Sequence, residues 1–90
     1  MGFYEKINSG AYKPKVKYVS RKKDEAQWQA YKDELARLDA EFKRDALKEV
    51  GLENHPKANK AFAFAWSLGH ASGFSEVFSY LEEIAEILKD

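Results

Sequence analysis

The stretch that decides the fold of this chain is residues 61–75, which read AFAFAWSLGHASGFS and include no side chain charged at neutral pH. Small residues recur in it at every fourth position, and bulky residues run beside them. Residues four apart follow one another along one face of an α-helix, so the two series form neighbouring ridges. A ridge of small side chains lets a second helix approach closely. The stretch therefore predicts helix packing through Ala61, Ala65, Gly69 and Gly73, with Phe62, Trp66, His70, Phe74 and Val77 beside them.

The same stretch lies inside a longer helical pattern that predicts a second helix over about residues 56–89. Its C-terminal part places apolar residues on one face and glutamates on the other. Gly69 and Gly73 each cost about 1 kcal/mol inside a helix, and Ser72 is able to cap a new helix instead. We expect one continuous helix, because the four-residue spacing runs unbroken through both glycines.

Upstream, apolar residues at alternating steps of three and four predict a first helix over about residues 21–50. Ser20 is a candidate N-cap, and Asp24 with Gln27 offers an alternative capping box. Gly51 is the expected end, because Leu47 and Leu52 then occupy the two apolar positions of a Schellman motif. The short connection over residues 51–56 makes the second helix fold back antiparallel.

The pattern of residues 1–19 predicts an extended arm. Gly10 and Pro14 break up any helical pattern, and Val16 and Tyr18 alternate with lysines, which is a period of two. Residues 1–23 carry seven Lys/Arg and only one Glu. This basic segment either neutralises the acidic helices, within one chain or between subunits, or contacts phosphates of a nucleic acid or nucleotide. The acidic helices oppose the second interpretation by repelling a phosphate backbone. The candidate contacts are Lys13, Lys15, Lys17, Tyr18, Arg21, Lys22 and Lys23.

Together these patterns predict an all-α fold, with an extended basic arm over residues 1–19 and an antiparallel helical hairpin over residues 20–90. The first helix offers a single apolar seam, whereas the second is apolar nearly all round between Ala58 and Leu81. A helix of the second kind needs several neighbours, so we expect the arm or a second copy to cover it. Two-fold dimers are the commonest assembly, and a homo-oligomer is the predicted state.

Composition narrows the chemistry. Ninety residues make one domain at most, and the absence of cysteine excludes disulfides and thiolate metal sites. The uncharged stretch is shorter than the roughly 20 residues of a membrane-spanning helix, so we expect no membrane partner and a cytoplasmic location. His70 is a candidate base, metal ligand or pH switch, although a hydrogen-bonded interface histidine is the commoner role. His55, before Pro56, is more typical of a cap. No catalytic motif is present, and we predict neither enzyme activity nor a metal or cofactor.

The C-terminal part of the chain resembles small uncharacterised helical accessory proteins encoded by bacteriophages. The resemblance covers about a third of the chain and brings no catalytic residue. It implies action in the cytoplasm of an infected bacterium, on a host factor or a nucleotide signal, or as an assembly part. The expected function is therefore non-enzymatic protein binding with self-assembly, and the alternative is binding of nucleic acid or a phosphate ligand by the arm. The resemblance rests on residues 55–58 (HPKA), 65–66 (AW), 69–73 (GHASG), 76–77 (EV) and 80–82 (YLE).

Overall fold

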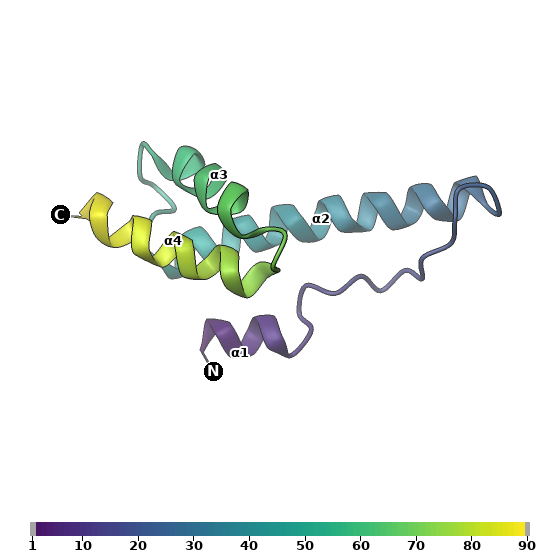
Figure 1. The fold of residues 1–90 in the computed structure, drawn as a ribbon, viewed down its shortest axis with the longest axis horizontal. Coiled ribbons are helices and arrows are strands. Elements are labelled where there is room, and N and C mark those ends of the chain that lie inside the picture. The colour runs from purple at the N-terminus through teal and green to yellow at the C-terminus, as the bar shows by residue number, and fades with distance from the viewer. Residues whose placement is uncertain (1, 90) are drawn as a thin grey trace.

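The structure, a computed structural model, describes residues 2–89 and contains four α-helices in that range (Figure 1). They are α1 (Phe3–Asn8), α2 (Glu25–Glu49), α3 (Ala58–Gly69) and α4 (Phe74–Lys89). No β-strand occurs in the described range, which confirms the predicted all-α class. Helices α3 and α4 form an antiparallel pair beside the C-terminal half of α2, and α1 lies against α4 (Figure 1).

Both ends of α2 follow from local side-chain chemistry. The helix begins after Asp24, whose carboxylate accepts a hydrogen bond from the backbone N–H of Gln27 at 3.1 Å, so Asp24 rather than Ser20 is the N-cap. At the other end the N–H of Leu52 donates to the carbonyl of Leu47 at 2.8 Å. The N–H of Gly51 donates to Lys48, and Gly51 has a φ of +77°. The predicted Schellman motif is therefore confirmed.

The predicted continuous second helix is wrong. Helix α3 ends at Gly69, residues 70–73 form a turn, and Gly73 adopts a φ of +114°, which a helix interior does not allow. A Cβ built on Gly69 would lie 2.7 Å from the backbone nitrogen of Val77. The bare glycine thus lets the first turn of α4 pack directly onto the end of α3. The small ridge does serve close helix packing, but its partner is the next helix of the same chain.

The N-terminal segment is not extended throughout, because its first part forms α1. Phe3 on α1 and Tyr12 after it are both buried in the core. The Phe3 ring lies 4.4 Å from that of Phe78 on α4, measured between centroids, and the Tyr12 ring lies 5.3 Å from that of Phe42 on α2. This segment therefore covers the helical body of its own chain. Residues 9–24 contain neither helix nor strand.

Phe42 is the centre of the core and is fully buried. Its ring stacks on Phe74 at 4.4 Å and contacts Phe3, Tyr12 and Phe62 at centroid distances of 5.3 to 6.0 Å. The core lies at the C-terminal half of α2, where all four helices meet. The N-terminal half of α2 projects from this body with only the preceding loop beside it (Figure 1), and the molecule measures 51 × 26 × 22 Å.

Candidate binding surfaces

The small ridge predicted from the sequence is enclosed by the fold. Ala61, Ala65 and Gly69 are buried on α3, whereas Gly73 is exposed in the turn and makes no packing contact through its Cα face. A second copy of the chain therefore has no access to the first three. Because α4 already covers this ridge, the ridge does not serve as a contact surface between two chains.

The bulky series beside the ridge forms a stack along α3 that ends in solvent. The Trp66 ring lies 5.9 Å from that of Phe62 and 5.7 Å from that of His70, and the His70 and Trp66 planes differ by 10°. His70 Nδ1 lies 2.8 Å from the carbonyl oxygen of Trp66, and the histidine is exposed. Phe74 and Val77, predicted on the same helix, belong to α4, where Val77 is fully buried. His70 therefore interacts with a backbone carbonyl of the preceding turn at the exposed end of α3, and its interface role stays a prediction.

A different set of apolar side chains remains exposed on the α3–α4 pair. Phe64 is 60% exposed and Leu68 49%, and they lie four residues apart on α3. Ile87 on α4 is 74% exposed, next to the half-buried Tyr80 and Ile84. Phe62 and Trp66 on α3, and Phe74 and Phe78 on α4, face α2 and α1. In the helical projection the exposed series lies on the side of both helices away from α2. We call Phe64, Leu68, Tyr80, Ile84 and Ile87 the outer face.

The outer face was not predicted from the sequence, although a four-residue series of apolar side chains marks its α3 half. Lys60, Phe64 and Leu68 form a third four-residue series in the same stretch. In the sequence this series has the same spacing as the two buried series. Which of the three is exposed depends on the turn at residues 70–73, because that turn sets which side of α3 meets α4.

The predicted cationic residues gather on one loop, which we call the basic loop and define as residues 13–23. All seven predicted contact residues on it are exposed. The loop runs beside α2, because the Lys15 backbone N–H donates to Glu34 at 3.2 Å and the Tyr18 ring makes an edge contact with Tyr31 at 5.3 Å. At its end Arg21 pairs with Glu25 at 3.3 Å. The loop thus runs along the projecting half of α2, from the body to the tip of the molecule (Figure 1).

The basic loop also encloses a pocket of about 380 Å³. The side chains that line it combine two lysines with an aromatic ring and a hydroxyl. They are Lys17, Tyr18, Val19, Ser20 and Lys23.

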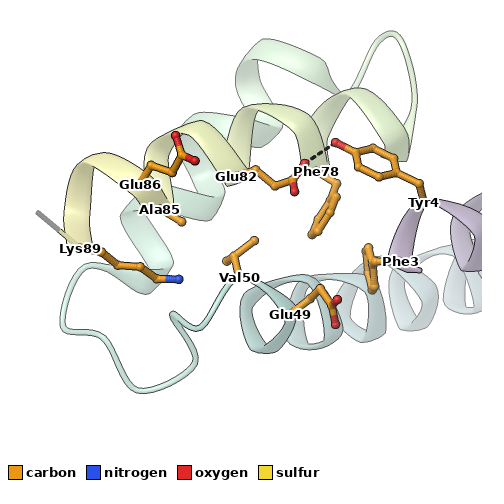
Figure 2. A pocket seen from close by; sticks show the side chains of 9 residues that line it. All are labelled: Phe3, Tyr4, Glu49, Val50, Phe78, Glu82, Ala85, Glu86 and Lys89. Carbon is orange, nitrogen blue, oxygen red and sulfur yellow. Dashed lines mark hydrogen bonds between the residues drawn. The ribbon is translucent and has the colours of Figure 1, made fainter. Parts of the chain in front are cut away.

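A second pocket, of about 280 Å³, lies between α1, α4 and the end of α2 (Figure 2). Its floor is apolar, and exposed glutamates stand around it with Lys89 at one end. The Tyr4 hydroxyl donates to Glu82. Burial, and then this hydrogen bond, raise the pKa of Tyr4. The nine residues are Phe3, Tyr4, Glu49, Val50, Phe78, Glu82, Ala85, Glu86 and Lys89.

Two further features concern residues 2–89 as a whole. No helix in this range is both long enough and apolar enough to cross a membrane. Nor does this range bring together three or more histidine, aspartate or glutamate side chains in a geometry that would hold a metal ion.

The chain belongs to DUF8546, a family of unknown function whose model matches residues 1–89. Comparison with curated proteins found no match. Comparison with solved structures also found none. The bacteriophage resemblance and the cytoplasmic location therefore stay predictions from the sequence.

Proposed function

We propose that this chain is a non-enzymatic binding protein that self-assembles through the outer face of α3 and α4 and presents its other surfaces to a protein target. The observation that carries the proposal is the exposure of Phe64, Leu68 and Ile87 on one side of a helix pair whose opposite side faces α2 and α1. Contiguous exposed apolar side chains of this kind mark contact surfaces. Burial of each one stabilises a complex by about 1.5–3 kcal/mol.

Charge favours a second copy as the occupant of this face. Lys60 is the one charged residue of α3, whereas α4 carries four glutamates and Lys89. Lys60 precedes Phe64 by one helical turn, and Glu83 precedes Ile87 by one turn, so both flank the outer face. A two-fold pairing that sets α3 of one copy against α4 of the other brings opposite charges together and buries both apolar series.

The test is the mass of the protein in solution, measured by light scattering after size exclusion over a range of concentrations. The native chain is expected at twice 10.3 kDa. The double variant Phe64→Ser with Leu68→Ser is expected at 10.3 kDa with its helical circular dichroism retained, because both side chains are exposed in the single chain.

The matched control is Ala63→Ser, which also introduces a serine into α3, at an exposed position on the side toward α2. It should keep the doubled mass. A native chain that stays at 10.3 kDa at every concentration, or a double variant that keeps the doubled mass, would overturn self-assembly through this face.

A further inference from the structure

Most cations of the basic loop form no ion pair with the rest of the described chain, although Lys15 lies beside Glu34. Among the described residues, no carboxylate lies within ion-pair distance of its five lysines, and Arg21 is the one loop cation with a partner. All six side chains are exposed. The loop therefore presents positive charge to solvent. The five lysines are Lys13, Lys15, Lys17, Lys22 and Lys23.

The fold also removes the electrostatic objection to a phosphate partner. Residues 13–38, the basic loop and the projecting half of α2, carry eight Lys/Arg and four Asp/Glu, a net charge of +4. Residues 39–89 carry six Lys/Arg and nine Asp/Glu, a net charge of −3. The glutamates of α4 lie in the body, and the molecule is 51 Å long (Figure 1). Screening at physiological salt acts over about 8 Å, so the α4 charges have little effect at the end of the loop that lies beside the start of α2 (Figure 1).

One aromatic ring in this region is available to a ligand. Trp28 is already engaged, with Arg21 at 5.2 Å and Lys32 at 4.8 Å from its ring. Tyr18 is 60% exposed, contacts Tyr31 in an edge geometry, and lines the 380 Å³ pocket together with Lys17 and Lys23. A ring held in place beside two ammonium groups is suited to stack a base while the lysines contact its phosphates.

We infer that the basic loop binds single-stranded nucleic acid, with one nucleotide in the pocket formed by Lys17, Tyr18 and Lys23. The base stacks on Tyr18, the adjoining phosphates contact Lys17 and Lys23, and the remaining loop lysines contact phosphates further along the strand. A single strand is favoured over a duplex because only unpaired bases offer a free face to a tyrosine. This surface is separate from the outer face, so the inference does not depend on self-assembly.

The experiment is fluorescence anisotropy of a labelled oligothymidylate of about 15 nucleotides, titrated with the full chain from 50 to 200 mM salt. Each phosphate contact to a single strand changes the slope of log K against log salt by about 0.7. The double variant Lys17→Gln with Lys23→Gln should bind at least tenfold more weakly. The slope of log K against log salt should become less steep by about 1.4. Tyr18→Ala should weaken binding about tenfold at an unchanged slope, and Tyr18→Phe should restore it.

The charge-matched control is Lys48→Gln with Lys57→Gln, two exposed lysines of the body, which should bind as the native chain does. Absence of binding at 50 mM salt would overturn the inference, as would equal losses in the loop and body variants. Competition by polyglutamate or by phosphatidylserine vesicles as effective as that by unlabelled oligothymidylate would also overturn it, in favour of a general anion surface. A monomeric chain that binds the oligonucleotide refutes only the proposed self-assembly, and a dimer that fails to bind refutes only this inference.

Discussion

At the scale of single residues, the contact that attaches the N-terminal segment to α2 is centred on Asp45. The Tyr12 hydroxyl donates to Asp45 Oδ2 at 2.8 Å, and Lys6 Nζ lies 3.2 Å from the same oxygen. Burial alone would raise the pKa of Asp45, but the hydrogen bonds from Tyr12 and Lys6 outweigh it and hold that pKa below its usual value. Burial and the same hydrogen bond raise the pKa of Tyr12.

The lowered pKa makes this contact pH-dependent. A carboxylate whose pKa is lower in the folded state stabilises the fold fully above its unfolded pKa of about 3.9, and this contribution is lost as the pH falls through the folded value. Asp45→Asn should lower the free energy of unfolding at pH 7 by about 1–2 kcal/mol. In urea titrations the difference from the native chain should shrink below pH 4. An equal difference at pH 7 and pH 3 would show that the charge of Asp45 does not matter.

The close approach at Gly69 gives a second prediction at this scale. A methyl group there would lie 2.7 Å from the Val77 nitrogen and 2.9 Å from the Glu76 carbonyl carbon, both backbone atoms that do not move aside. Gly69→Ala should therefore cost about 1–3 kcal/mol in urea unfolding, although alanine is the better helix former. Gly2→Ala is the control, because nothing lies within 4 Å of the added atom. Equal stability of both variants would contradict the packing of α3 on α4.

At the scale of elements, the division of the C-terminal half into α3 and α4 is tested by whether one substitution raises or lowers the stability of the fold. Gly73 has a φ of +114°, and no atom lies within 4 Å of an added Cβ. In the turn, Gly73→Ala should destabilise the chain by about 1–2 kcal/mol through backbone strain alone. In a continuous helix the same change would stabilise it by about 1 kcal/mol. Thermal unfolding followed by circular dichroism distinguishes the two, and a rise in melting temperature would support the unbroken helix.

The ends of α2 could be predicted because they depend on neighbouring residues: Asp24 caps Gln27, and Gly51 lets Leu52 reach Leu47. The break after Gly69 could not. The four-residue spacing is the same whether the small ridge meets another chain or the next helix of its own chain. That choice depends on the length of the turn and on how much core the rest of the chain provides.

Burial of Phe3 and Tyr12 was likewise a matter of tertiary contact. Tyr4 and Tyr18 in the same segment are equally aromatic but exposed, so the sequence does not show which of these rings enter the core. The cations of the basic loop were predicted from composition alone, but the pocket around Tyr18 depends on how the loop itself turns between Lys17 and Lys23, which no local pattern specifies.

At the scale of the whole molecule, the chain separates its two proposed contacts. The outer face lies on the helical body, and the basic loop runs beside the projecting half of α2 in a molecule 51 Å long (Figure 1). Pairing of two bodies through the outer face would leave both loops accessible. A dimer would then present two phosphate-binding surfaces, and the second would bind at a raised effective concentration on the same strand. Dimer-breaking variants are accordingly expected to weaken binding of an oligonucleotide long enough to span both loops more than binding of a short one.

The most direct test of the central claim, that two copies meet through the outer face, is disulfide cross-linking between single-cysteine variants. The chain contains no cysteine of its own. A mixture of Phe64→Cys and Ile87→Cys chains, oxidised mildly and run on a non-reducing gel, should form the mixed dimer rapidly. A mixture of Phe64→Cys with Glu53→Cys, exposed in the connection between α2 and α3, should form it slowly. Equal rates in the two mixtures would show that the outer face is not where copies of this chain meet.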